Sequence, residues 1–354
     1  MSDAVVFLCD RDELDKERLG YVRAFERRMR VDFIAPQDGV AWRDRVRELS
    51  PLLVLNPDGR WWLPEEIERL EFPTAVFHID VFAATNRRIL AAPLYDHVFI
   101  FHPGFAERFR HPGARLLPHA ADATMAGDPR RARTWEVGWV GHRGRSIYRR
   151  RDSALEALSA RFVMNDAARA YSAYEMAELY GDSQIVVNVS RDDWPQDANM
   201  RCFEAMAAGA LLITRVPTEL TDLGFRESVH FVGYRDGQDL TAVVAQYLAR
   251  HDERLAIAER GHELVMREHT YDARVETILS AVRSNRHAPA RNWPPVRAWR
   301  VHFDAHVEQG DVPRSLRWFR RIGTSSLSSA AASTPRLIRL LAKILRRKLR
   351  RSSA

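Results

Sequence analysis

Apolar and polar positions follow one another along the chain in blocks that predict a parallel α/β protein. Short apolar runs of the kind found in buried strands lie at residues 4–9, 31–35, 51–56, 74–79, 97–101 and 115–118. Polar stretches of helical composition, such as residues 13–30 and 42–49, separate most of them. Strands that alternate with helices are typical of parallel sheets.

The same pattern restarts after residues 123–134, a polar segment with Gly, Pro and Arg that we interpret as an interdomain linker. Further strands are expected at residues 135–141, 162–164, 184–190, 210–214 and 229–232. Ser172 and Glu175 have the spacing of a capping box at a helix start. We therefore predict an N-terminal domain over residues 1–122, a second domain over 135–286, an extension over 287–333 and a terminal helix over 334–354.

Residues 184–214 (QIVVNVSRDDWPQDANMRCFEAMAAGALLIT) form the most informative stretch. The pattern predicts a buried strand, a polar loop, a helix over residues 200–208 that ends at Gly209, and a second strand. A right-handed βαβ crossover places such a loop at the carboxyl edge of the sheet, where ligands of open α/β sheets bind. The free amides of the helix start suit phosphate. A βαβ unit without any ligand is the alternative.

The segment NMRCFEAMAAGALLIT resembles the donor-binding motif of GT-B glycosyltransferases of the group 1 (family 4) type. It is most similar to their CgeB-like branch, named after a spore maturation protein. The segments YDHVFIFHPGFAERFRHPGARLLPHAAD and REHTYDAR also resemble that branch. The resemblance covers roughly residues 1–285 and implies a GT-B fold, with two Rossmann-like domains whose parallel sheets face a cleft.

The resemblance also implies a nucleotide-sugar site. By analogy with the family, Glu204 accepts hydrogen bonds from the ribose hydroxyls of the donor. The family's first Glu, separated from the second by seven residues, contacts the donor sugar, but here Gln196 occupies that position with Asp197 beside it. Gln196 can still bond a sugar hydroxyl, although it lacks the charge. This departure puts full transferase competence in question.

Other polar residues at the predicted strand and helix ends are candidates for donor binding. Arg201 can fork onto phosphate oxygens, although a solvated helix arginine is an equal alternative. Asn199 fits an N-cap, which would explain it without any ligand. The remaining candidates are Asn188, at the end of the central strand, and Gly141, His142 and Arg143, in a turn that follows a strand. A plain turn at the end of the strand would also explain Gly141 and Gly144.

Candidates for acid–base chemistry lie in and after the first domain. An inverting transferase needs a general base, for which Asp80 or His119 is available. The family that the chain resembles is largely retaining and needs no such base. His302 and His306 have a helical HxxxH spacing but no evident third ligand, so two unrelated histidines are the simpler explanation. We expect neither a metal nor another cofactor.

The positive net charge of the chain comes from its C-terminal part. The net charge is +7, yet the residues from His287 onward hold 15 of the 54 basic and only 3 of the 47 acidic residues. The body is therefore acidic, which argues against a nucleic-acid partner. The chain has two cysteines, no apolar run of roughly 20 residues and no signal-peptide pattern at its start, so we expect a cytoplasmic protein.

The last segment has the pattern of a basic amphipathic helix. Residues 324–333 (TSSLSSAAAS) are interpreted as a small-residue linker, and Pro335 as the opening of a helix. Leucine and isoleucine fall on one side of that helix over residues 334–351, and Arg and Lys fall largely on the other. Such a helix suits an anionic inner leaflet. A disordered basic tail or a helix docked on a partner are the alternatives.

Together these observations predict a hexosyltransferase that moves a sugar from a nucleotide donor to a surface-glycan, lipid-linked or protein acceptor. Such an enzyme would serve cell-surface polysaccharide biosynthesis and could act as a peripheral protein of the inner membrane. A GT-B protein that binds a sugar nucleotide or a partner without turnover is the alternative, motivated by Gln196. A sugar-nucleotide epimerase is a third possibility without a matching acid/base set.

Overall fold

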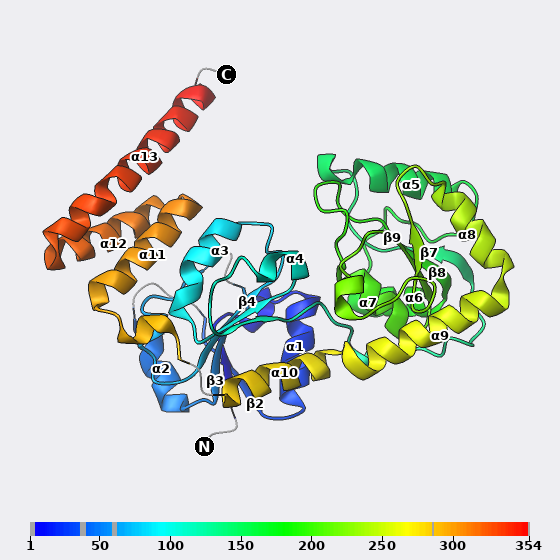
Figure 1. Cartoon of the computed structure of the whole chain (residues 1–354), viewed down its shortest axis with the longest axis horizontal. Helices are drawn as coiled ribbons and strands as arrows, with labels where there is room; N and C mark the ends of the chain where they lie inside the picture. Colours follow the sequence, from blue (N-terminus) through cyan, green and yellow to red (C-terminus); the bar gives the residue numbers. More distant parts are fainter. Residues whose placement is uncertain (1–3, 36–39, 59–61, 285–286, 353–354) are drawn as a thin grey trace. The chain divides into compact units, whose positions relative to one another are not determined.

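The computed structural model describes residues 4–35, 40–58, 62–284 and 287–352, and the chain divides into two compact units (Figure 1). Unit 1 comprises Met1–Leu14, Phe25–Leu117 and Ile278–Ala354, and unit 2 comprises Asp15–Ala24 and Pro118–Thr277. Each unit holds its own parallel sheet. The predicted α/β class is confirmed for both halves.

The sheet of unit 1 has the strand order β2-β1-β3-β4-β5-β6, with all neighbours parallel. Its strands are β1 (Ala4–Phe7), β2 (Arg30–Phe33), β3 (Leu53–Asn56), β4 (Thr74–His78), β5 (His97–Ile100) and β6 (Ala114–Leu116). Its short helices are α2 (Trp42–Leu49), α3 (Thr85–Ala91) and α4 (Pro103–Ala106). Every residue of β1, β3, β4 and β5 is buried, as expected for a sheet covered on both faces.

The sheet of unit 2 has the order β10-β9-β8-β7, again parallel throughout. Its strands are β7 (Trp135–Gly138), β8 (Ser183–Asn188), β9 (Leu211–Arg215) and β10 (Val232–Tyr234). Its helices are α5 (Arg149–Ser159), α6 (Ala173–Gly181), α7 (Met200–Ala207), α8 (Leu240–Ala249) and α9 (His251–Glu268). Most of α1 (Lys16–Glu26) and the start of α10 (Tyr271–Arg283) also belong to this unit.

Two hydrophobic cores lie on the two faces of this second sheet. Residues of α6, α7 and α9 form one core with Val186 and Leu212, and residues of α5 and α8 form the other with Ile185 and Ile213. Neighbouring residues of one strand enter different cores because side chains alternate across a sheet. The two faces therefore present different helix starts at the carboxyl edge.

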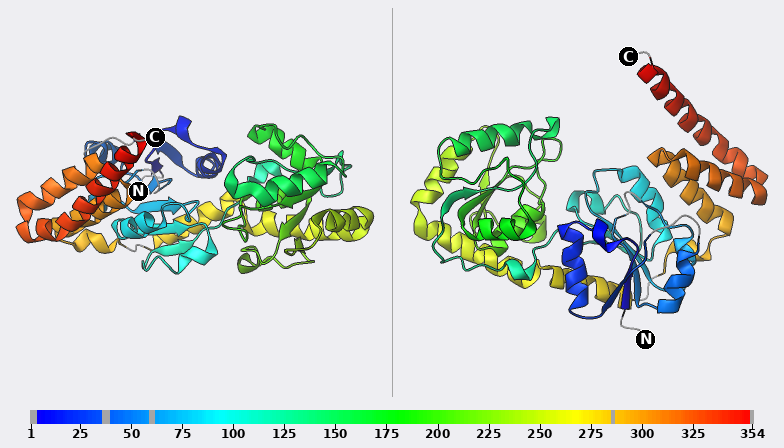
Figure 2. Two further views of the ribbon diagram at one scale, coloured as in Figure 1. Left: turned by 90° about the horizontal axis from the view of Figure 1, so that it is seen from above. Right: turned by 180° about the vertical axis from the view of Figure 1, so that it is seen from behind.

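The C-terminal extension is a group of helices in unit 1: α11 (Pro295–Gln309), α12 (Val312–Ser325) and α13 (Leu327–Ser352). They pack on one another around Phe303, Trp318 and Ile322, and the last turns of α13 extend past α11 and α12 (Figure 2). Leu337 and Leu340 of α13 are buried in this group, whereas Ile338 and Leu341 are exposed. The side chains after Ile344, which include Leu345 and Leu349 of the predicted apolar stripe, lie outside the described part of the chain.

Three local predictions differ from the structure. Residues 324–333 are not a linker, because α12 continues to Ser325 and α13 starts at Leu327, with Pro335 inside it. Alanine favours a helix here, and Ser326 accepts a hydrogen bond from the amide of Ser329 at the start. Residues 162–164 contribute only an isolated bridge to β7, and the strand expected at 229–232 is β10, two to three residues later.

Candidate functional site

The start of α7 is built from local signals that the sequence already carries. Asn199 is the N-cap, and its side-chain oxygen accepts a hydrogen bond from the amide of Arg201 at 3.1 Å. Gly209 ends the helix with a φ of +74°, where a Cβ would lie 2.8 Å from the backbone of Pro129. The amide-rich end of α7 lies beside the carboxyl end of β8, as predicted.

Asn188, at the end of β8, is the centre of a buried polar network. Its Oδ1 accepts hydrogen bonds from Arg201 Nη1 at 2.7 Å and from Asn199 Nδ2 at 3.0 Å. Its Nδ2 lies 3.1 Å from Thr214 Oγ1 and 3.3 Å from Ser190 Oγ. The side chain is fully buried. Asn188 therefore ties the ends of β8 and β9 to the first turn of α7.

Arg201 is buried at the same edge and bonds to the strand on the other side of β8. Its Nη2 and Nε donate to the carbonyl of Val140 at 2.8 and 3.2 Å, and its guanidinium lies 5.0 Å from the ring centroid of Trp139. A Cβ on Gly141 would come within 2.5 Å of Arg201 Nη2, so a larger residue there would displace the guanidinium. The arginine thus has a structural role at the edge, and its contact with phosphate stays a prediction.

The turn of residues 141–144 follows β7 and is mostly exposed. Arg143 Nε lies 3.3 Å from Asp152 Oδ1, and its Nη2 lies 3.6 Å from Glu156 Oε1. Gly144 has a φ of +74° and donates its amide to Asp152 Oδ2 at 3.0 Å. Acidic residues of α5 therefore hold Arg143 and the turn in place beside the edge.

Arg151 supports the same edge and was not singled out from the sequence. Its Nη1 donates to the carbonyl of His142 at 2.7 Å, and its Nε donates to the carbonyl of Val189 at 2.8 Å. Burial and the neighbouring Arg201 lower the pKa of Arg151 to about 10. A run of three arginines at a helix start offered no signal that the last of them would be buried.

Gln196 and Asp197 lie in the loop before α7. The backbone carbonyl of Gln196 accepts a hydrogen bond from the amide of Glu219 at 2.9 Å. The side chain of Gln196 is partly exposed, and its contact with the donor sugar stays a prediction. Asp197 is buried, and its Oδ2 lies 3.3 Å from Asn199 Nδ2. Glu219, also buried, accepts the amide of Ala198 at 3.2 Å. The sequence carries no spacing that links Glu219 to this loop.

Glu204 does not belong to the Asn188 network and lies instead in a pocket of about 420 Å³. Helices α1, α6, α7 and α10 line this pocket with mostly apolar side chains, among them Met176, Met200 and Tyr271. Lys16 Nζ lies 2.8 Å from Glu204 Oε1 and 2.9 Å from Met176 Sδ. Glu204 is therefore a buried carboxylate that a half-exposed lysine of a distant segment holds. Lys16 was missed because nothing in the neighbouring sequence predicts the contact.

The two candidates for a general base are found in different units. Asp80 follows β4 in unit 1 and is exposed, with a φ of +43°. His119 lies in unit 2, where its Nδ1 is 2.6 Å from Glu17 Oε1, and both side chains are buried. A carboxylate that orients a histidine in this way is a common support for a base. The catalytic roles stay predictions for both residues.

His302 and His306 both lie on α11 and are buried. His302 Nε2 faces Glu68 Oε2 at 3.2 Å, and its ring stacks on Trp318 with centroids 4.4 Å apart. Burial lowers the pKa of His306 to about 3. These contacts give His302 a place in the packing of unit 1 that needs no metal.

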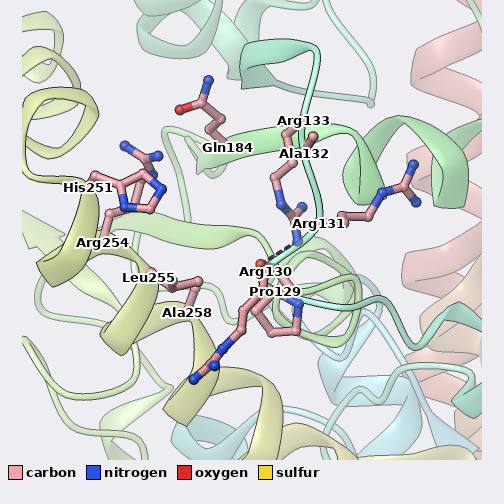
Figure 3. A pocket seen from close by; sticks show the side chains of 11 residues that line it. Pro129, Arg130, Arg131, Ala132, Arg133, Gln184, His251, Arg254, Leu255 and Ala258 are labelled. Atoms are coloured by element: carbon pink, nitrogen blue, oxygen red, sulfur yellow. Dashed lines mark hydrogen bonds between the residues drawn. The ribbon is translucent and has the colours of Figure 1, made fainter.

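A further pocket of about 370 Å³ lies at the amino edge of the sheet of unit 2, and Figure 3 shows its arginines. Arg133 donates to six carbonyls, including those of Gly181 and Gly209 at the ends of α6 and α7. Arg254 donates to two carbonyls at the end of α8. These arginines offset the negative ends of three helices, so we assign them a structural role.

Comparisons with known proteins bear on the family and the fold. Residues 114–280 match a family model described as glycosyl transferase-like. The fold is similar to HepE of Anabaena in complex with UDP and glucose, with 11% identity, a TM-score of 0.57, and coverage of 79% of this chain and 99% of that one. Sucrose-phosphate synthase from Thermosynechococcus elongatus has 11% identity and a TM-score of 0.57, covering 80% and 99% of the two chains.

A glycosyltransferase from Rickettsia africae has 8% identity and a TM-score of 0.55, covering 80% of this chain and 98% of that chain. No curated protein sequence matches at a significant level. The fold is GT-B, as the resemblance implied. At these identities the structural likeness establishes the fold and leaves activity to the site itself.

Proposed function

We propose that the protein is a glycosyltransferase that moves a hexose from a nucleoside-diphosphate donor to an acceptor hydroxyl. The observation that carries this proposal is the buried carboxylate of Glu204, which lines a pocket of about 420 Å³ and is held by Lys16. The glycosyl transferase-like match over residues 114–280 includes this glutamate. UDP-glucose is the first donor to test, because a HepE structure contains it.

In this proposal the apolar part of the pocket takes the nucleoside. The carboxylate of Glu204 accepts hydrogen bonds from the two ribose hydroxyls, and Lys16 keeps the carboxylate oriented. The diphosphate then lies toward the carboxyl edge of the sheet, where the open amides of α7 and the cations Arg143 and Arg201 favour negative charge. Gln196 and Asp197 are left to bind the sugar.

The chemical step breaks the bond between the sugar carbon and the diphosphate oxygen. The acceptor oxygen forms the new bond, and its proton passes to the departing phosphate. Stabilising the charge that develops on this leaving group is the main electrostatic task, and we assign it to arginines and helix amides without a metal. We expect retention of configuration. NMR of the first product anomer tests this, and an inverted anomer would instead require a base such as His119 or Asp80.

A protein that binds the donor without turnover is the second candidate. Gln196 favours this non-catalytic alternative, because it stands where the family has a glutamate that contacts the donor sugar. Release of free hexose from the donor, or transfer to an acceptor, separates the two. Binding of a donor without either product would support the non-catalytic alternative.

The test of the site is thermal stabilisation by UDP-, GDP- and dTDP-sugars. A ligand at 100 times its Kd stabilises the folded state by about 2.7 kcal/mol. We expect one nucleotide class to raise the Tm of the wild type, and Glu204→Gln to remove the shift. Glu263→Gln, an exposed carboxylate of α9, is the matched control and should keep it. A full shift in Glu204→Gln would contradict the assignment of the pocket.

The acceptor and the location are further parts of the proposal. A surface-glycan or lipid-linked acceptor would suit a cytoplasmic enzyme whose α13 lies on an anionic inner leaflet, because its sequence combines leucines with Arg and Lys. Among the residues that the structure describes, no helix combines the length and hydropathy needed to cross a bilayer.

The membrane test follows from the packing of α13. Leu337 belongs to the core of the extension and Leu340 is buried, so a deletion that starts at residue 334 would damage the fold. Removal of residues 345–354 retains both leucines. This shorter deletion should abolish sedimentation with phosphatidylserine vesicles and leave donor binding unchanged. Undiminished sedimentation would exclude the end of α13 as the anchor.

A further inference from the structure

A third pocket in unit 2 shares no lining residue with the pocket of Glu204. It has a volume of about 570 Å³ and opens at the carboxyl ends of β8, β9 and β10, beside the starts of α5 and α8. Pockets of this size are typical of small-molecule sites. Because α5 and α8 cover the face opposite to α7, this pocket lies on the other side of the sheet from Glu204.

Four arginines and three aspartates line the pocket. Arg215 forms a two-fold contact with Asp236, at 2.8 and 2.5 Å, and Arg150 lies 3.7 Å from the same carboxylate. Two guanidinium groups therefore share one carboxylate. Arg191 pairs with Asp193 at 2.7 Å. The side chain of Arg149 makes no ion pair or hydrogen bond within the described residues, so at least one lining cation is available to a ligand.

The remaining carboxylates of the pocket are engaged by the backbone. Asp239 caps α8 by accepting the amide of Thr241 at 2.8 Å, and Asp192 Oδ1 lies 3.4 Å from the amide of Arg150. The residue before α5, Tyr148, provides no side-chain cap. Asp192 thus already pairs with one of the first amides of this 11-residue helix, and the helix dipole adds a partial positive charge at the same place. An anionic group is therefore favoured here.

Tyr234 gives an independent indication of a ligand. The residue is 8% exposed and lines the pocket, yet its hydroxyl makes no hydrogen bond to any part of the chain that the structure describes. Burial raises the pKa of this phenol to about 12, so it is a neutral donor at physiological pH. Because Tyr234 is largely buried in the wall of the pocket while its hydroxyl has no partner in the described chain, that hydroxyl can bond a ligand hydroxyl.

We infer that this pocket binds a small phosphorylated sugar. The phosphate lies against Arg149 and the start of α5, with Arg150 and Arg215 close by, since guanidinium groups match phosphate oxygens in a forked geometry. The sugar hydroxyls reach Tyr234 and the exposed side chain of Gln238, which also lines the pocket. This inference does not depend on the proposed transfer reaction or on Glu204.

Calorimetric titration of the full chain with glucose 6-phosphate, glucose and inorganic phosphate tests it. Glucose 6-phosphate should bind at least about 10-fold more tightly than glucose or inorganic phosphate, because both ends of the pocket contribute to its binding. Arg149→Gln should weaken this binding about 10-fold, because a hydrogen bond to a charged group is lost. Tyr234→Phe should weaken it about 5-fold, because a hydrogen bond between neutral groups is lost. Both positions tolerate these changes because neither side chain has a partner to lose.

Two controls separate this site from the nucleotide site. Arg226→Gln, an exposed arginine of the same unit outside the pocket, should bind glucose 6-phosphate like the wild type. Saturating UDP and Glu204→Gln should leave the affinity unchanged. Equal binding by Arg149→Gln and the wild type, equal affinity for inorganic phosphate and glucose 6-phosphate, or displacement by UDP would each overturn the inference. Failure of UDP to bind at all would affect only the proposed function.

Discussion

Replacing Asn188 by alanine should destabilise unit 2 and loosen the edge at which we place the donor. The change removes a charge-assisted hydrogen bond from Arg201 at 2.7 Å, a neutral one from Asn199 at 3.0 Å, and the bonds that the Asn188 amide donates. A bond to a charged group contributes about 1.5–3 kcal/mol and a neutral one about 0.5–1.5 kcal/mol. With partial re-pairing of the partners, the loss should be roughly 3–5 kcal/mol.

The matched variant is Asn188→Asp, which keeps both acceptor positions for Arg201 and Asn199 but loses the donors to Thr214 and Ser190. It should cost about 1–2 kcal/mol, because only neutral bonds disappear and the new charge faces Arg201.

The assay for both variants is urea unfolding followed by circular dichroism, with the Tm measured in parallel. For a unit of this size, a loss of 3–5 kcal/mol corresponds to a fall in Tm of roughly 6–20 °C. UDP-sugar binding by Asn188→Ala, measured well below its Tm, should also weaken, since Arg201 and the start of α7 lose their anchor. A loss below about 1 kcal/mol for Asn188→Ala, or equal losses for Ala and Asp, would refute the reasoning.

Three further predictions concern separate features of unit 2. Lys16→Met should weaken UDP-sugar binding about 10-fold in a titration, because it removes the cation that holds Glu204. Lys16→Arg keeps a cation there and should retain most of the binding. Gly141→Ala should cost about 1–3 kcal/mol in urea unfolding, since its Cβ would lie 2.5 Å from Arg201 Nη2; an unchanged midpoint would show that the turn relaxes freely. Burial lowers the pKa of His269 to about 3, so the unfolded chain binds more protons between that value and about 6.5. The free energy of unfolding should therefore fall by about 2 kcal/mol from pH 7 to pH 5, and His269→Gln should show a flatter pH dependence than the wild type.

The unit from β8 to β9 shows what the sequence determines alone. The two strands, the helix between them, its N-cap Asn199 and its end at Gly209 were all predicted, as was the capping box of Ser172 and Glu175. These features depend on residues within one or two turns of each other, so the pattern of a short window contains the whole interaction.

The error at residues 324–333 has a related physical reason. A run of Ser and Ala with a following Pro is compatible with a linker or a helix, because its intrinsic preference is weak. Packing of Leu337 against the core of α11 and α12, together with the burial of Leu340, decides for the helix. That packing depends on residues in other helices, which the local pattern does not contain.

The candidate site divides in the same way. The sequence and its family resemblance indicated Asn188, Arg201 and Glu204, but the tertiary structure separated them into a buried network at the sheet edge and a carboxylate in a pocket. Only the tertiary structure supplies Lys16, because the ion pair with Glu204 joins the first helix of the chain to the seventh. The polar chemistry of each residue was determined by the sequence, whereas its partners were decided by the fold, since contacts between distant segments depend on how the two sheets and their helices pack.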